Sequence, residues 1–423
     1  MRRGGGGRGA AGVTLAVLRL LRPGDSGGFG GFGGVSAGRT LWPTLPRCPP
    51  RRRLCSSGPP WRLLFLGSDH FAVESLKVLA AERSRAGGAV SSLEVATLSA
   101  DVPVADFARR QHLALHAWPP ADVDGRFDVG VVVSFGCLLH QTFIDKFACG
   151  ILNVHPSLLP RWRGPAPIFH TILNGDAVTG VTIMQIRARR FDEGPILNQA
   201  LHTVPETSTA ERLADVLAVK GARLQLLDTL RDLPRRMADK REQSPTGATF
   251  APKIGVSMSW MVWEEHTCRD IDRLYRAIGW RIPLRTTWMG RTVKLVDFAG
   301  RCHISFAGLS RRAVFVWLPL PSRPDGAHWA FSSHSDASEE RTPGRVSFHK
   351  ESDTLAVRCK DGWVAFKAVI LNKRLTAADF YNGYLHQTLR RRGGAARDSA
   401  PPAAFVSPPS TRPPDVGKRL HRD

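Results

Sequence analysis

Apolar runs alternate with amphipathic segments through the first half of the chain. Short and nearly continuous apolar runs predict buried strands, and helically spaced apolar positions between them predict helices. Expected strands are 62–66, 93–98, 128–134, 150–154 and 180–186, and expected helices are 71–81, 104–112, 144–148, 168–173 and 211–230. Strands that are apolar on both faces and alternate with helices predict an α/β fold, with a doubly wound and mostly parallel sheet.

The pattern changes in the second half, where short strands follow one another with a single helix between them. The strands are expected at 258–263, 292–298, 313–318, 354–359 and 363–370, and the helix at 271–278. Short strands separated by turns predict a small β-barrel. We therefore expect an N-terminal leader (1–60), an α/β domain (61–233), a linker (234–255), a β-barrel domain (256–387) and a disordered basic tail (388–423).

Basic residues dominate the charge of this 423-residue chain, which has a formal net charge of +22. The first 60 residues contain ten arginines, no lysine and a single acid, Asp25, and thus contribute +9. A leader that is rich in arginine and glycine and poor in acids is typical of a mitochondrial presequence, and a disordered glycine–arginine tail is the alternative. We expect the protein in the mitochondrial matrix. The remaining +13 favours a polyanionic partner.

Cysteine usage and hydropathy exclude several classes of protein. The seven cysteines are scattered and form no Cys-x-x-Cys pair. This pattern argues against a disulfide scaffold and against a zinc site, so we expect no metal. No apolar run is long enough to span a bilayer, since the run from Val13 to Leu18 ends at Arg19. We therefore expect no membrane partner.

One strand end carries the most informative chemistry of the chain. Asn153 and His155 are two residues apart, so both side chains leave the same face of an extended strand. An amide and an imidazole can polarise a carbonyl and stabilise the oxyanion that it becomes. Asp192, in a turn after a later strand, could orient the imidazole and help to remove a proton from an attacking amine. The three side chains suit acyl transfer to an amine, whereas a structural histidine and an ordinary turn are the alternatives.

The surrounding motif adds a family resemblance. Asn153 and His155, followed by the run Ser157 to Gly164 and by Asp192 in an Asp-x-Gly turn, resemble the central motif of the folate-dependent formyltransferases. The resemblance covers residues 61 to about 387 and is strongest for the branch that acts on tRNA. It implies a Rossmann-like domain and a barrel similar to an OB-fold. It also implies that a monomer transfers a formyl group from 10-formyltetrahydrofolate to initiator methionyl-tRNA, with Asn153, His155 and Asp192 as catalytic residues.

The same resemblance assigns the remaining site residues. It implies that the folate pocket is lined by Ser157, Leu158, Leu159, Pro160, Phe135 and Gly136. It implies that tRNA phosphates contact Arg161, Arg163, Lys253, Arg291, Lys294, Lys373 and Arg374. Two departures from the family pattern stand out. Residues 99–104 form a short loop without a basic residue, where relatives carry a basic insert, and Glu193 replaces a common Thr in the Asp-x-Gly turn.

Two other functions stay open on the sequence. Formyl transfer to a small amine, such as glycinamide ribonucleotide, would need no basic second domain. A non-catalytic RNA-binding protein would not need an intact set of Asn153, His155 and Asp192.

Overall fold

The computed structural model describes residues 58–188, 190–307, 312–317, 342–387 and 403–408. The expected leader, apart from its last three residues, lies outside this range. The chain forms two compact units. The first comprises Met1–Arg163, Gly180–His202 and Ala214–Thr249, and the second comprises Gly164–Thr179, Thr203–Leu213 and Phe250–Asp423.

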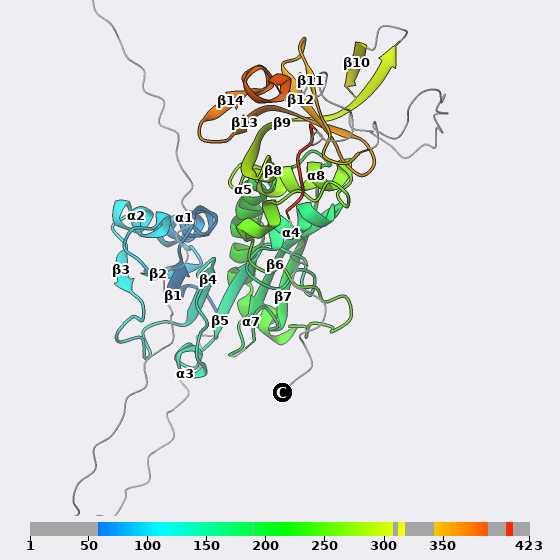
Figure 1. Cartoon of the computed structure of the whole chain (residues 1–423). Helices are drawn as coiled ribbons and strands as arrows, with labels where there is room; N and C mark the ends of the chain where they lie inside the picture. The colour runs from blue at the N-terminus through cyan, green and yellow to red at the C-terminus, as the bar shows by residue number, and fades with distance from the viewer. Residues whose placement is uncertain (1–57, 189, 308–311, 318–341, 388–402, 409–423) are drawn as a thin grey trace, which may run out of the picture. The chain divides into compact units, whose positions relative to one another are not determined.

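A seven-stranded sheet organises the first unit (Figure 1). Its strands are β1 (Trp61–Gly67), β2 (Val90–Thr97), β3 (Ala114–Ala117), β4 (Val129–Val133), β5 (Ile151–His155), β6 (Val178–Gln185) and β7 (Ile196–Thr203), in the spatial order β3-β2-β1-β4-β5-β6-β7. The pairs from β3 to β5 are parallel, and β6 runs antiparallel to β5. The expected mostly parallel sheet is confirmed. The sequence pattern misses β3 and β7, because their residues are largely exposed or half-buried and form no continuous apolar run.

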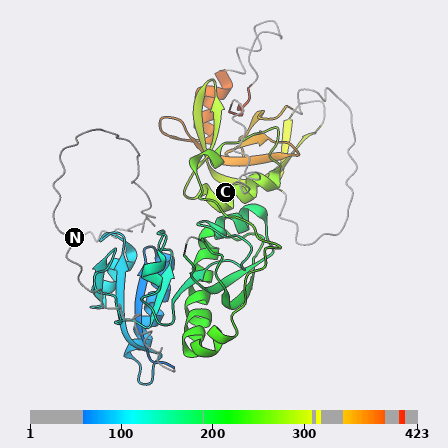
Figure 2. The ribbon, with the colours of Figure 1, turned by 90° about the horizontal axis from the view of Figure 1, so that it is seen from below.

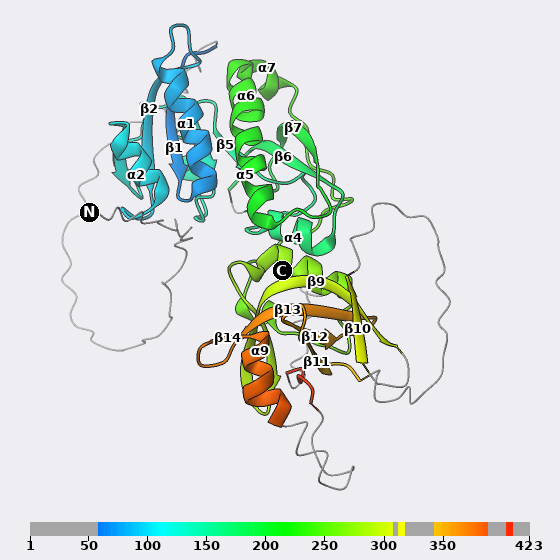
Figure 3. The ribbon, with the colours of Figure 1, turned by 90° about the horizontal axis from the view of Figure 1, so that it is seen from above.

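Helices connect the strands or follow them, and several of these helices cover the sheet (Figure 3). They are α1 (His70–Ser84), α2 (Pro103–Arg110), α3 (Gln141–Ile144), α4 (Pro167–Asn174), α5 (Ala210–Lys220), the π-helical η1 (Gly221–Leu226), α6 (Leu227–Arg231) and α7 (Leu233–Ala238). The helix expected at 211–230 is confirmed as the continuous run α5–η1–α6. A Cβ atom on Gly221 would lie 3.1 Å from Val154, so this run packs closely against β5. The helix expected at 144–148 is wrong. The helix ends at Ile144, and the amides of residues 146, 147 and 150 bond three residues back as turns.

Antiparallel strands form the second unit, as the labels in Figures 1 and 3 show. They are β8 (Leu284–Trp288), β9 (Arg291–Ala307), β10 (Arg312–Trp317), β11 (Val346–His349), β12 (Thr354–Arg358), β13 (Trp363–Ile370) and β14 (Arg374–Thr376). The sheet order is β10-β9-β13-β12-β11, with β8 paired to β9 and β14 to β13. By the division given above, this unit also contains α4 and the first residues of α5. Its other helices are η2 (Val256–Ser259), α8 (Cys268–Leu274), η3 (Tyr275–Gly279), α9 (Ala377–Phe380) and η5 (Tyr381–Leu385). This sheet is consistent with the small β-barrel expected from the sequence.

Two segments of the second unit differ from the sequence expectation. The strand expected at 258–263 is replaced by the 3-10 helix η2, an isolated bridge between Trp260 and Arg285, and turns. Trp263 is fully buried there, and its indole nitrogen donates a 2.9 Å hydrogen bond to Thr286. Residues 403–408 fall inside the expected disordered tail, yet the structure places them. Phe405 is buried against Trp263 and Trp288, and its amide bonds to the carbonyl of Gly344 at 2.7 Å.

Strands β1 to β4 of the first unit appear in blue and cyan in Figure 2, whereas β6 and β7 fall in the green part of the colour range. Within the described ranges, no helix combines the length and the apolar character needed to cross a bilayer.

Candidate functional site

Two of the three predicted catalytic side chains, those of Asn153 and His155, approach one carboxylate oxygen of the third, Asp192, in the first unit. The Asn153 side-chain nitrogen, Nδ2, donates a hydrogen bond of 3.1 Å to Oδ1 of Asp192. Nδ1 of His155 lies 3.6 Å from the same oxygen. Strand β5 delivers Asn153 and His155, and the turn between β6 and β7 delivers Asp192. The structure thus brings together an amide, an imidazole and a carboxylate that the sequence places far apart.

The imidazole of His155 is held in one tautomer. Its Nε2 lies 2.9 Å from the carbonyl oxygen of Trp162. A carbonyl can only accept a hydrogen bond, so Nε2 carries the hydrogen. The other ring nitrogen, Nδ1, therefore faces Asp192 and is the atom that can gain or lose a proton there. The ring is buried, which limits its alternative orientations.

Backbone geometry fixes the turn that carries Asp192. This residue has a φ of +54°, in the left-handed region that a non-glycine residue seldom adopts. Two positions further, a Cβ atom on Gly194 would lie only 1.8 Å from the carbonyl oxygen of Gln185, so only glycine fits. The side-chain amide of Gln243 donates to the carbonyl oxygens of Asp192 and Gly194, at 2.7 and 2.8 Å. Gln243 lies in the expected linker, and no local sequence pattern singles it out.

Arg163 supports the same turn from inside the protein. Its Nε donates to the Gln243 side-chain oxygen at 3.0 Å, and its guanidinium lies 3.5 Å from the carboxylate of Glu193. Arg163 is only 8% exposed. The expectation that Arg163 contacts a tRNA phosphate does not fit this burial. Its positive charge is also already matched by the carboxylate of Glu193. The Glu193 that departs from the family pattern thus has a partner in this chain.

The loop expected to bind folate is tied to the sheet beneath it. Ser157 is fully buried, and its hydroxyl donates to the carbonyl of Arg161 at 2.7 Å. The hydroxyl of Thr182 on β6 donates to the carbonyl of Ser157 at 2.7 Å and accepts from the amide of Leu159 at 3.2 Å. Ser157 and Leu159 are buried, whereas Leu158 and Pro160 are partly exposed. Leu158 and Pro160 are therefore the members of this loop that a ligand could touch.

The ends of β1 and β4 contribute a second polar pair near the expected Phe135–Gly136 turn. Asp69 caps α1 by accepting a 3.0 Å hydrogen bond from the amide of Ala72, and it also bonds to the side chain of Ser134. Burial outweighs these hydrogen bonds and raises the pKa of Asp69 above its ordinary value. Phe135 is buried, whereas Gly136 is exposed with a φ of +77°. Gly136 is therefore the accessible residue of the expected pair.

The basic residues expected to contact tRNA fall into separate groups. Arg161 stacks its guanidinium 4.5 Å from the ring centre of Trp162 in the first unit. In the second unit, four basic residues lie at or near two neighbouring turns, β8–β9 and β13–β14. These four are Arg291, Lys294, Lys373 and Arg374. Arg291 donates to Asn372 at 3.1 Å, Lys294 is paired in register with Ile370, and Arg374 forms an ion pair with Asp297. Lys253 is exposed in the segment before η2.

Comparison with known proteins finds one family model and several relatives that this chain resembles. Residues 121–227 match the formyl transferase family. The mitochondrial methionyl-tRNA formyltransferase of Homo sapiens is 46% identical over 333 residues, which cover 78% of this chain and 79% of that protein. The methionyl-tRNA formyltransferase of Roseobacter denitrificans is 37% identical over 249 residues, covering 56% of this chain and 79% of its own length.

The solved structures to which this chain is similar include HypX from Aquifex aeolicus in complex with tetrahydrofolic acid. It has a TM-score of 0.47 and 16% identity, and the match covers 77% of this chain and 48% of that one. Glycinamide ribonucleotide transformylase 1 from Symbiobacterium toebii has a TM-score of 0.36 and 25% identity, with 41% of this chain and 88% of that chain covered.

Proposed function

This chain belongs to the methionyl-tRNA formyltransferase family, and on that premise we propose that Asn153, His155 and Asp192 perform its formyl transfer. The chain is a formyltransferase of the mitochondrial type. Its substrates are methionyl-tRNA and a folate that donates the formyl group. The observation that carries the catalytic assignment is the convergence of Asn153 Nδ2 and His155 Nδ1 on a single oxygen of Asp192.

The first chemical step is attack of the neutral amine of methionyl-tRNA on the formyl carbon. A carbon–nitrogen bond forms, and the formyl oxygen becomes an oxyanion that needs hydrogen-bond donors. An amide side chain has two N–H groups, and Asn153 gives one of them to Asp192. Its second N–H is the donor that we assign to the oxyanion. Because Asp192 fixes the amide in advance, little reorganisation is required when the charge develops.

The proton of the attacking amine leaves towards Asp192 and His155. Nδ1 of His155 and Oδ1 of Asp192 are 3.6 Å apart, so a proton held at Nδ1 is stabilised by the carboxylate. Collapse of the tetrahedral intermediate breaks the bond between the formyl carbon and the donor nitrogen. The proton then passes to that nitrogen, so that formylmethionyl-tRNA and tetrahydrofolate are the products and the site is restored.

We also propose the identity of the formyl donor, the residues that contact the donor and the tRNA, the oligomeric state and the location. The donor is 10-formyltetrahydrofolate, and it contacts Leu158, Pro160 and Gly136, while the buried Ser157, Leu159 and Phe135 shape the pocket from behind. The tRNA phosphates contact the accessible basic residues Arg161, Lys253, Arg291, Lys294, Lys373 and Arg374. A monomer suffices, because one chain supplies all three catalytic side chains. The arginine-rich leader supports a location in the mitochondrial matrix.

A competition assay tests the choice of acceptor. Purified protein is given 10-formyltetrahydrofolate with methionyl-tRNA and an excess of glycinamide ribonucleotide. We expect formylmethionyl-tRNA as the product, with uncharged tRNA and glycinamide ribonucleotide unmodified. Formylation of glycinamide ribonucleotide at a comparable rate would assign the enzyme to small amines. Binding of tRNA without any formyl transfer would favour a non-catalytic RNA-binding protein.

A further inference from the structure

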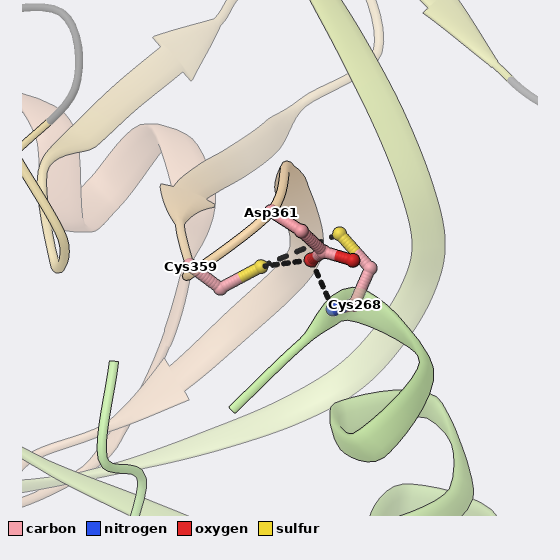
Figure 4. A group of neighbouring side chains, drawn as sticks. All are labelled: Cys268, Cys359 and Asp361. Carbon is pink, nitrogen blue, oxygen red and sulfur yellow. Dashed lines mark hydrogen bonds between the residues drawn. The ribbon is translucent and has the colours of Figure 1, made fainter. Parts of the chain in front are cut away.

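Three side chains of the kinds that can bind a metal ion meet in the second unit, outside the catalytic site (Figure 4). Cys268 is the first residue of α8, Cys359 follows β12 directly, and Asp361 lies in the turn between β12 and β13. Both cysteines are free thiols and are buried, whereas Asp361 is exposed. The formyl-transfer mechanism uses none of these residues.

The donor atoms of the cluster are close enough to share one cation. The two sulfur atoms are 3.3 Å apart, and an oxygen of Asp361 lies 3.6 Å from the sulfur of Cys359. All three donor atoms fall within 4.8 Å of one another. A tetrahedral zinc ion with Zn–S bonds of about 2.3 Å separates two thiolates by roughly 3.8 Å. The sulfur atoms need to move apart by only about 0.5 Å to reach this spacing.

The backbone around the cluster holds these groups in place. The Asp361 carboxylate accepts a 2.7 Å hydrogen bond from the amide of Cys268, which aims the carboxylate at the thiols. A Cβ atom on Gly362 would lie 2.8 Å from the Cys268 sulfur, so glycine permits the close approach of the turn. The thiol of Cys359 also donates to the carbonyl oxygen of Gly362 at 3.3 Å, which holds its sulfur at the turn.

We propose that Cys268, Cys359 and Asp361 form a structural zinc site, with water as the fourth ligand. Two thiolates and a carboxylate are ligands that Zn²⁺ accepts, and the exposed side of Asp361 gives water access to the ion. Binding releases two protons, one from each thiol, and the resulting Zn²⁺–thiolate–carboxylate group has a net charge of −1. The ion links the start of α8 to the β12–β13 turn.

The chief alternative is that the two cysteines form a reversible disulfide. Such a bond requires an oxidant to remove two electrons, and it gives no role to Asp361. The carboxylate beside the thiols is what favours a cation over a disulfide. The sequence alone could not indicate this site, since 91 positions separate the two cysteines and no Cys-x-x-Cys pair is present.

Metal content of the full chain tests the proposal. The protein is purified under reducing conditions, equilibrated by dialysis against buffered Zn²⁺, and measured by mass spectrometry for bound metal. We expect about one tightly bound zinc per chain, and at least 10-fold weaker binding in Cys359→Ser and in Asp361→Asn. Cys137→Ser removes a partly exposed cysteine of the first unit, and Asp101→Asn removes an exposed carboxylate, so both serve as controls and should bind zinc as the parent does.

Two further measurements distinguish the outcomes and guard against misfolding. Co²⁺ in place of Zn²⁺ should produce thiolate-to-cobalt charge-transfer absorption in the parent but not in Cys359→Ser. Zinc should raise the melting temperature of the parent and leave that of Asp361→Asn almost unchanged, with far-UV circular dichroism confirming that the variant is folded. Retention of zinc by both variants would overturn the proposal. So would a parent without metal, whether alkylation finds two free thiols or a Cys268–Cys359 disulfide.

Discussion

The side-chain amide of Asn153 donates a 3.1 Å hydrogen bond to Asp192 across 39 positions of the sequence. Through this bond, strand β5 and the turn after β6 support one another, and one N–H group of the amide is aimed before any substrate arrives. His155 shares the same carboxylate oxygen, so removal of Asp192 disturbs both partners. Asn153, His155 and Asp192 therefore form a coupled set rather than three independent residues.

Replacement of His155 or Asp192 should abolish most of the activity. We expect His155→Ala and Asp192→Ala each to lower kcat by ~10²-fold or more, the usual range for lost acid–base and oxyanion groups. Because the residues act together, the double variant should be little worse than the poorer single variant. Steady-state kinetics of folded proteins checks this. A folded His155→Ala enzyme that works near the parental rate would remove His155 from the mechanism.

Gln243 should position the Asp192 turn without touching the substrate. Gln243→Ala removes two hydrogen bonds to the turn and the partner of Arg163. We expect kcat to fall by about 10-fold while KM for methionyl-tRNA stays within about 2-fold, because geometry is lost rather than binding. Gln141→Ala, which removes an exposed amide bonded to Asp145, is the matched control. Equal effects of the two substitutions would contradict the positioning role.

Basic residues at or near the β8–β9 and β13–β14 turns should determine the salt dependence of tRNA binding. Reversing the charges of Arg291, Lys294 and Lys373 together should weaken binding and flatten the plot of log KM against log salt, since fewer counterions are released. Affinity for the folate should change little.

A control variant reverses three exposed basic residues of the first unit, Lys77, Arg83 and Arg110, and thus changes the net charge equally. We expect it to retain most of the parental salt slope. If both triple variants have the same slope as the parent, these residues are only surface charge, and tRNA recognition belongs to other parts of the enzyme.

The leader should be dispensable for catalysis and necessary for import. The first core strand begins only at Trp61, so a chain that starts at Pro60 should retain activity and fail to enter mitochondria. Fractionation of cells that express both forms checks the location. Import of the shortened chain, or delivery of the full chain to the secretory pathway, would contradict the targeting role.

The Arg62–Asp128 pair should make part of the stability depend on acid pH. Burial opposes ionisation of Asp128, but hydrogen bonds from the Arg62 side chain and backbone, together with its charge, outweigh burial and hold the pKa of Asp128 below its ordinary value. Because the folded-state pKa is the lower one, the pair stabilises the fold above the unfolded-state pKa of about 4. This contribution is lost as the pH falls through the folded-state pKa.

Melting temperatures measured between neutral and acid pH check this dependence. The difference between the parent and Asp128→Asn should be largest near neutral pH and should shrink below about pH 4. Asp101→Asn at an exposed position should show no comparable effect. A constant difference between parent and Asp128→Asn at every pH would mean that ionisation of Asp128 contributes nothing to stability.

The sequence by itself determined the features that depend on short-range order. The period of apolar residues identified the core strands β1, β4 and β5, and a two-residue spacing placed Asn153 and His155 on one strand face. The same patterns failed where burial depends on distant partners, as for the half-exposed β7, for the buried aromatic segment around Trp263, and for Phe405 in the basic tail.

Only the tertiary structure decided which distant side chains meet. It brought Asp192 to Asn153, took Arg163 out of solvent to pair with Glu193, and recruited Gln243 from an unremarkable polar segment. It also brought together the Cys268, Cys359 and Asp361 cluster, for which the spacing of the cysteines gave no sign. The physical reason is that periodicity reports which face of a local element is buried. The path of the chain determines what that face touches.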